Sequence, residues 1–229
     1  MIWVLQNTDA MDDCILLTEL SEGNIDAMRE LMDRYIPLVS RTSYRILCDR
    51  VDSETVTHEV FMRLWNHPRY FVSKHGLETR LLRLTCRMSR YRLVRRRFLA
   101  YFSINPDIFV ASAPAVPSAD EYIVRQAWEI YCRASRNCSD WERIAYTLCE
   151  LEGVPVDKAS EVMNPWISSV GELLANARSA VMAELDHYGR TEDYPAYLRF
   201  LRKVEDQLTD KIKAQRMVIA DIKVGKNHR

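Results

Sequence analysis

The segment Leu77–Phe102, LETRLLRLTCRMSRYRLVRRRFLAYF, constrains the fold more than any other part of the chain. Its apolar residues recur at the three- and four-residue steps that place side chains on one face of a helix, and this face can dock on a core. These residues are Leu77, Leu81, Leu84, Met88 and Tyr91. The same segment holds eight arginines and a single acid, Glu78. We therefore predict a long helix with one buried face and one strongly basic face.

The basic face follows the same helical steps one residue earlier than the apolar face. It is about 100° around the helix from the buried side, so we expect it to point toward solvent or toward a partner. Guanidinium groups match phosphates, and aromatic rings stack on unpaired bases, which together indicate a nucleic-acid contact. The residues predicted to make that contact are Arg80, Arg83, Arg87, Arg90, Tyr91, Arg95, Arg96 and Arg97. The alternative is an ordinary solvated face, although such faces usually mix charges of both signs.

Length and composition favour an all-α protein of two helical domains. The chain has 229 residues, of which 48% are hydrophobic, and it has only six glycines. Its net charge is zero overall but uneven along the sequence. Residues 11–102 hold sixteen basic and twelve acidic side chains, residues 121–188 hold six and eleven, and residues 189–229 hold ten and six. The basic segments are therefore the places where an anionic partner is expected.

Several classes of protein are not indicated by the sequence. The start of the chain lacks the basic, long apolar pattern of a signal peptide, and no apolar run reaches membrane-spanning length, so a cytoplasmic protein is expected. The six cysteines lack metal-ligand spacing and are interpreted as reduced core residues, with no metal or other cofactor. The five histidines are scattered, without a nucleophile and base at a useful spacing, so no enzyme is predicted.

Upstream of the basic helix, two further helices are predicted. The first has Ile25, Met28, Leu31, Met32, Tyr35, Leu38 and Val39 on one face, with Ser21 and Asn24 as cap residues of successive helices. The second runs from about Ser53 to Asn66 and stops before Pro68, which cannot continue a helix. Its inward side chains are expected to be Val56, Val60, Phe61, Leu64 and Trp65.

The block from Gly23 to Arg97 resembles the second conserved region of bacterial RNA polymerase sigma factors of the extracytoplasmic-function type. The resemblance is carried by Met28, Leu31, Arg34 and Tyr35, by Arg45-Ile46-Leu47, by Asp52-Ser53-Glu54, by Glu59-Val60-Phe61 with Leu64-Trp65, and by Leu77, Thr79 and Leu81. It implies that the helix from Asp52 to Trp65 docks on a coiled coil of the largest polymerase subunit. The implied docking residues are Asp52, Glu54, Thr55, His58, Glu59 and Arg63.

The resemblance also implies that Tyr70 to Arg97 holds the unpaired strand of a melting minus-ten promoter element. Thr55 and His58 stand where the family usually has an acid and a glutamine, and Arg80 replaces a frequent tryptophan. The first ten residues precede the usual acidic, leucine-rich opening of the family, so residues 1–10 are predicted to be dispensable. A possible anti-sigma partner is left open.

The second predicted domain follows a linker. Residues 103–119 contain three prolines and no helical pattern, which is typical of a flexible, extended linker. Residues 120–188 are similar to the fourth region of the same family, a helix-turn-helix with a turn around Asn164 and Pro165. Its recognition-helix residues would be Ser168, Ser169, Gly171, Glu172 and Arg178, among which only Arg178 keeps the basic character of the family. Weak binding to the minus-thirty-five element is therefore expected.

Residues 189–229 lie beyond the usual end of the family and form a basic C-terminal helical extension. Three interpretations of it remain open: a helix packed on the second domain, a partner-binding helix, or a basic arm that supplies DNA affinity. For the whole chain, the predicted function is promoter recognition by RNA polymerase. The alternatives are a sigma-like protein that binds core or a regulator without specific promoter recognition, and a nonspecific DNA-binding helical protein.

Overall fold

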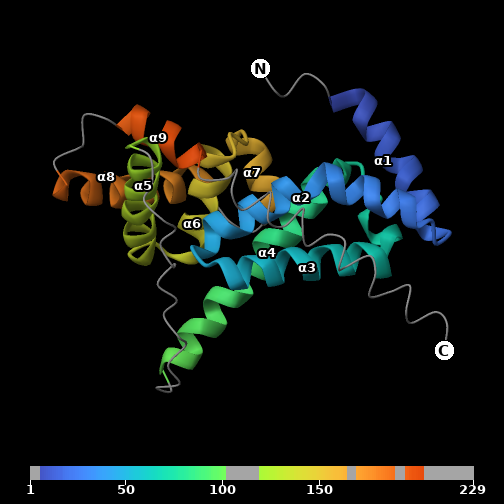
Figure 1. Cartoon of the computed structure of the whole chain (residues 1–229), viewed down its shortest axis with the longest axis horizontal. Coiled ribbons are helices and arrows are strands. Elements are labelled where there is room, and N and C mark those ends of the chain that lie inside the picture. Colours follow the sequence, from blue (N-terminus) through green and yellow to red (C-terminus); the bar gives the residue numbers. More distant parts are fainter. Residues whose placement is uncertain (1–5, 102–118, 164–168, 189–193, 204–229) are drawn as a thin grey trace.

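The computed structural model describes residues 6–101, 119–163, 169–188 and 194–203. Every regular element within these ranges is a helix, which confirms the all-α class (Figure 1). The first half of the chain supplies α1 (Gln6–Ser21), α2 (Ile25–Leu47), α3 (Arg50–Asn66), the short 3-10 helix η1 (Pro68–Phe71) and α4 (Gly76–Tyr101). The second half supplies α5 (Ala119–Arg136), α6 (Asp140–Tyr146), the π-helical turn η2 (Thr147–Leu151), α7 (Val156–Met163), α8 (Val170–His187) and α9 (Tyr194–Lys203).

Local capping explains where the central helices begin and end. The side chain of Asn24 accepts a hydrogen bond from the Asp26 amide at 2.9 Å at the start of α2, as predicted. Ser21 was predicted to be a second cap, but this is wrong: its hydroxyl donates to the Thr18 carbonyl at the end of α1. α2 stops at Cys48, which has a φ of 50° in the left-handed region, and Asp49 then caps α3.

The predicted apolar faces of α2 and α3 form most of the core of the first half. Only Ile25 departs clearly on α2, where it is exposed because it is the first residue after the cap. On α3, Trp65 is partly buried and the other four predicted residues are buried. α4 buries Leu77, Leu81 and Leu84 as predicted, but Tyr91 is 65% exposed. Tyr91 therefore belongs to the exposed surface of α4 and not to its buried face.

The two halves pack against each other, and one cluster of buried hydrophobic residues extends through both. α2 and α4 lie at the centre of the molecule, with α5, α6, α8 and α9 on the left, α1 on the right and α3 below α2 (Figure 1). The C-terminal part of α4 extends away from the other helices (Figure 1). Two separate domains therefore remain a prediction, and the proposed linker lies outside the described residues except for Ala119, which begins α5.

The two ends of the chain are only partly described. Gln6 to Ala10 belong to α1, so the segment predicted to be dispensable includes the beginning of this helix. At the other end, α9 packs on the second half and buries Tyr197 and Leu201. The first interpretation of the extension is thus confirmed for Tyr194–Lys203, whereas residues 204–229 lie outside the described ranges. Within the part of the chain that the structure describes, no helix combines the length and apolar character needed to cross a bilayer.

Candidate nucleic-acid interface

A groove of about 720 Å³ lies where the C-terminal end of α3 meets η1 and α4. Pro68 stops α3 and begins η1, and the buried ring of Phe71 anchors this short helix in the core. Arg87 reaches the groove from α4. The lining residues are Ser21, Arg63, Asn66, His67, Pro68, Arg69, Tyr70 and Arg87. Residues from α1, α3, η1 and α4 thus line one concave surface.

The groove is basic and contains an accessible aromatic ring. Arg63, Arg69 and Arg87 are all exposed, and no acid is among the described residues that line it. The Tyr70 side chain is 52% exposed, and the Arg80 guanidinium carbon lies 5.3 Å from the centre of its ring. Such a surface can pair its guanidinium groups with phosphates while Tyr70 stacks on an unpaired base. Arg69 and Tyr70 were not among the predicted contact residues, although Tyr70 begins the segment that the resemblance assigns to strand binding.

The stripe of arginines on α4 is divided between this groove and the second half of the chain. Arg87 is exposed and lacks a partner among the described residues. Arg83 instead donates to the Glu161 carbonyl of α7 at 2.5 Å, and Arg90 lies 4.6 Å from the ring centre of Trp141 of α6. Arg83 and Arg90 were expected to point toward solvent or a partner, but both contact the second half of the same chain, because α6 and α7 pack across α4.

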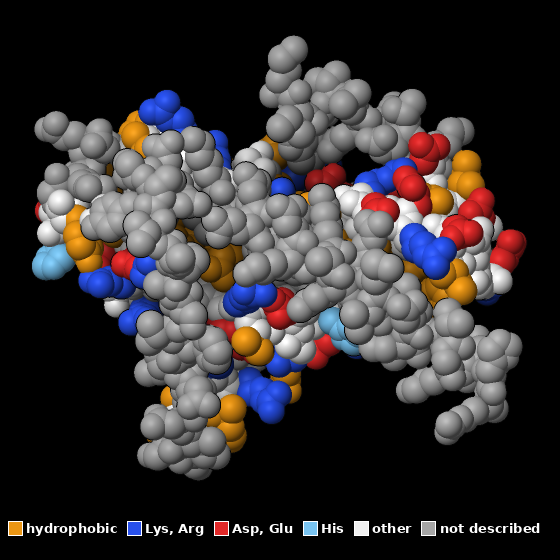
Figure 2. Space-filling model, viewed as in Figure 1, with side chains coloured by type: hydrophobic (Ala, Val, Ile, Leu, Met, Phe, Trp, Pro, Cys, Tyr) orange, Lys and Arg blue, Asp and Glu red, His pale blue; other side chains and the backbone are white. Residues whose placement is uncertain are grey.

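Further along α4, the predicted contact residues also have different surroundings. Arg95 is exposed, whereas Arg96 forms ion pairs with Asp49 at 2.8 Å and Asp52 at 2.5 Å. Arg97 donates to both carboxylate oxygens of Asp140 on α6, at 2.8 and 2.5 Å. The exposed Tyr91 lies on the same helix. Figure 2 shows basic and hydrophobic side chains side by side where the end of α4 is visible.

The residues predicted to dock on the polymerase all lie on α3, but the acids among them form ion pairs within the chain. Arg92 contacts Glu59 at 2.6 Å and Asp52 at 3.5 Å, because α4 lies alongside α3. Glu54 pairs with Arg50 at 2.7 Å, and the Thr55 hydroxyl donates to the Val51 carbonyl. His58 and Arg63 are exposed. The acidic character expected of this face is therefore largely balanced by neighbouring arginines.

The second half has the two helices expected of a helix-turn-helix, α7 and α8, with the turn outside the described residues. Ser169 caps α8 by accepting from the Glu172 amide at 3.1 Å, and Ser168 also lies outside the described residues. Gly171 and Glu172 are exposed. Arg178, the one basic residue retained, donates to the Glu150 carboxylate at 2.5 Å. Its charge is thus balanced, so the exposed surface at the start of α8 is acidic or neutral.

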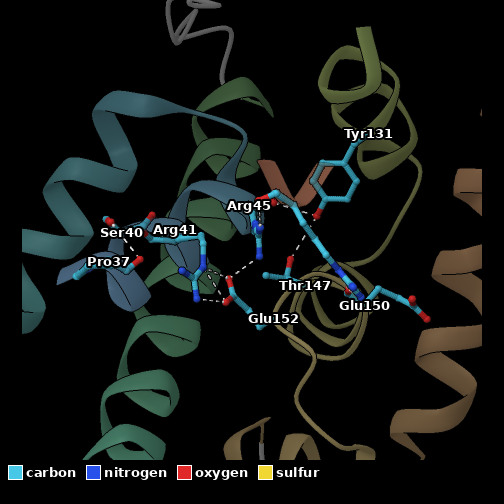
Figure 3. Close-up of polar contacts among 10 residues, drawn as sticks. Pro37, Ser40, Arg41, Arg45, Tyr131, Thr147, Glu150 and Glu152 are labelled. Carbon is cyan, nitrogen blue, oxygen red and sulfur yellow. Dashed lines mark hydrogen bonds and ion pairs between the residues drawn. The ribbon is translucent and has the colours of Figure 1, made fainter. Parts of the chain in front are cut away.

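A polar cluster joins the two halves (Figure 3). Glu152, just after η2, accepts from Arg45 at 2.8 Å and from Arg41 at 2.7 and 2.9 Å. The Tyr131 hydroxyl of α5 donates to the Arg45 carbonyl at 2.9 Å. Burial lowers the pKa of Arg45 to about 10, and the neighbouring Glu152 carboxylate opposes this change. Arg45 remains charged at neutral pH, so the cluster is an ion pair that fixes α2 against the second half.

No protein-family model matches this chain, and no curated protein is significantly similar to it. Its function is therefore argued from the geometry of the groove, the charge of α4 and the motifs described above.

Proposed function

We propose that this chain is a cytoplasmic transcription initiation factor that binds RNA polymerase core and directs it to promoters by holding the melted minus-ten element. The observation that carries the proposal is the groove formed by α3, η1 and α4. It offers three exposed arginines and one exposed tyrosine on a concave surface. Backbone phosphates and one unpaired base are the chemical groups that this combination fits best.

The position of the groove relative to the motifs gives further support. Arg63 and Arg69 flank the end of the helix that resembles the polymerase-docking helix, and Arg87 lies on the helix that resembles the strand-binding helix. A strand held in the groove would therefore lie next to the docking surface. Single-stranded DNA is favoured over a duplex because the Tyr70 ring can stack only on a base that is not already paired.

Binding of a fluorescent single-stranded oligonucleotide, measured by anisotropy over a range of salt concentrations, tests the groove directly. Arg69→Ala and Arg87→Ala should each reduce the slope of log affinity against log salt by about 0.7, because each removes one phosphate contact. Tyr70→Ala should weaken binding by about 1–3 kcal/mol with the slope unchanged, whereas Tyr70→Phe should retain affinity. Arg125→Ala, at an exposed site on α5, is the matched control. Unchanged slopes in both groove arginine variants would contradict the proposal.

A second function remains open because of specific contacts in the structure. Arg83, Arg90 and Arg97 of α4 all contact the second half of the chain, which makes them less available to DNA. This arrangement favours a sigma-like protein that binds core or a regulator without specific promoter recognition. Core polymerase and a promoter library separate the two functions. Specific initiation supports the first, and core binding without initiation supports the second.

A further inference from the structure

The C-terminal part of α4 carries an exposed apolar stripe that continues beyond the groove. The stripe consists of Tyr91, Val94, Phe98 and Tyr101, and we call these four residues the α4 seam. Their side chains are between 42% and 84% exposed. They belong to the part of α4 that extends away from the other helices (Figure 1). Exposed apolar side chains gathered on a projecting helix indicate a surface that another molecule covers.

The spacing of the α4 seam is that of a coiled coil. Its residues follow one another at steps of three, four and three, which are the steps between the a and d positions of a heptad repeat. At 1.5 Å per residue the seam is about 15 Å long, so a partner helix of about three turns can cover it. Val94 lies within the seam, and its branched side chain suits the holes between the side chains of a second helix. The seam therefore has the length and pattern that fit one further helix.

The charges beside the α4 seam are basic. Arg87 lies about one turn before the seam and Arg95 lies within it, and both are exposed and form no ion pair among the described residues. By contrast, Arg92, Arg96 and Arg97 on the other sides of α4 pair with acids from α3, from its N-cap and from α6. Charged side chains beside such a seam determine which helices pair with it. A partner is therefore expected to bring acids to Arg87 and Arg95.

We propose that the α4 seam binds an acidic amphipathic helix of a partner protein, which packs on it as the second helix of a short coiled coil. Apolar side chains of the partner lie against the seam, and its carboxylates pair with Arg87 and Arg95. A second copy of this chain fits poorly, because the arginines of the two helices would face each other in a parallel or an antiparallel pair. Single-stranded DNA also fits less well, because Val94 offers no flat ring on which a base can stack.

Arg87 connects the α4 seam with the groove, since it lines the groove and lies about one turn before Tyr91. A carboxylate that pairs with Arg87 takes the cation that the proposed function assigns to a phosphate. Binding of the acidic helix should therefore weaken the binding of single-stranded DNA. This consequence rests on the proposed function, whereas binding of the helix does not.

A designed peptide tests the α4 seam on the full-length protein. The probe is a fluorescent peptide of three heptads with leucine at a and d, glutamate at e and g, and alanine elsewhere. The controls are a scrambled peptide of the same composition and a peptide with lysine in place of glutamate. Anisotropy should show that the glutamate peptide binds at least about tenfold more tightly than either control. Equal binding by the glutamate and scrambled peptides would overturn the proposal.

Substitutions in the protein locate the peptide. Val94→Glu places a like charge within the seam and should weaken binding of the glutamate peptide by at least about tenfold. Val156→Glu, at a similarly exposed valine on α7, is the matched control and should bind as wild type does. Arg95→Glu should weaken binding of the glutamate peptide and strengthen that of the lysine peptide, an exchange that a folding defect cannot produce. Unchanged binding by both Val94→Glu and Arg95→Glu would place the peptide elsewhere and overturn the proposal.

Two further measurements separate the acidic helix from other occupants. Analytical ultracentrifugation of the wild-type protein should show a monomer. A dimer that Val94→Glu dissociates would assign the seam to a second copy of the chain and overturn the proposal. Tyr101→Ala should bind the single-stranded oligonucleotide as wild type does. A loss of about tenfold or more would assign the seam to nucleic acid and likewise overturn the proposal.

Competition between the peptide and the oligonucleotide tests the consequence. Saturating glutamate peptide should weaken binding of the oligonucleotide by at least about threefold, because it occupies one phosphate contact and adds negative charge nearby. The scrambled peptide should have no effect. Binding of both molecules without a mutual effect would contradict the competition. A protein without affinity for the oligonucleotide would instead contradict the proposed function, while the peptide measurements still decide whether the seam binds an acidic helix.

Discussion

Arg45 of α2 and Glu152, which follows η2, form an ion pair at 2.8 Å with only 2% and 1% of their side chains exposed. The pair joins two segments of the chain that are 107 residues apart. The half-buried Arg41 contacts the same carboxylate at 2.7 Å (Figure 3). A buried charge is costly unless it is paired, so loss of Glu152 would leave the buried Arg45 without this carboxylate.

Replacing Glu152 should therefore destabilise the whole molecule. Glu152→Ala is expected to lower the free energy of unfolding by about 3–5 kcal/mol, because it leaves two guanidinium groups without their shared carboxylate. Glu54→Ala removes an exposed pair with Arg50 and should change it by less than about 1 kcal/mol. Urea denaturation followed by circular dichroism measures both values. A Glu152→Ala protein as stable as the Glu54→Ala protein would show that the buried cluster does not hold the halves together.

Contacts between α4 and α6 should restrain nucleic-acid binding. Asp140→Asn removes the ion pair of Arg97, and Trp141→Leu removes the ring under Arg90. The combined variant should bind single-stranded DNA more tightly than wild type. Its salt slope should be steeper by about 0.7 for each released arginine that reaches a phosphate. Asp26→Asn, which frees the exposed Arg29 on α2, is the control and should not change the slope. Weaker binding by the combined variant would mean that these contacts help the interface and do not restrain it.

Glu78, the single acid of the basic helix, should make the protein less stable as pH rises. Burial raises its pKa, and the nearby Asp13 and Glu152 carboxylates raise it further. The unfolded chain releases this proton near a pH of about 4.3, whereas the folded protein releases it at a higher pH. Stability is therefore fully present below the unfolded pKa and is lost as pH rises through the folded value. Glu78→Gln should be more stable than wild type at pH 7 and similar to it at pH 4, as measured by urea denaturation. An equal effect at both values of pH would rule out titration of Glu78 as the cause.

The helices of the first half were predictable because their signals are local. Asn24 is a strong cap, Pro68 stops α3, and the three- and four-residue steps identify the buried residues of α2 and α4. The surroundings of the arginines were not predictable from the same patterns. Arg83 and Arg90 repeat with Arg87 on one stripe, but only tertiary packing decides that α6 and α7 cover the first two.

Two further features depend on contacts that sequence patterns do not carry. In sequence, Glu152 resembles an ordinary surface acid. In the structure it follows the π-helical turn η2 and is buried beside α2. Cys48 and Ser135 show no spacing motif, yet the Cys48 Sγ atom at the left-handed end of α2 lies 3.5 Å from the Ser135 Oγ atom of α5. By contrast, part of the groove could be predicted from the sequence, because Tyr70 and Arg87 lie within the segment that the resemblance assigns to strand binding.

The exposed start of α8 should bind duplex DNA weakly. Glu172 is exposed there, and Arg178 pairs with Glu150. None of the recognition-helix residues that the structure describes therefore offers an unpaired cation to DNA. Arg178→Ala should leave the salt dependence of duplex binding unchanged. Glu172→Lys should strengthen duplex binding and steepen its salt slope by about 0.9 if the new cation reaches a phosphate. Anisotropy with a minus-thirty-five duplex measures both. A reduced slope in Arg178→Ala would show that Arg178 leaves Glu150 to contact DNA.

The most direct measurement of the proposed function uses purified full-length protein with RNA polymerase core. Protein and core are combined, separated by size-exclusion chromatography, and supplied with a library of promoters and nucleotides. The proposal predicts that the protein co-elutes with core, that transcripts begin at specific promoters, and that Arg69→Ala with Arg87→Ala reduces initiation more than core binding. Failure to co-elute with core, with single-stranded DNA binding intact, would contradict the proposal and leave a nonspecific DNA-binding protein.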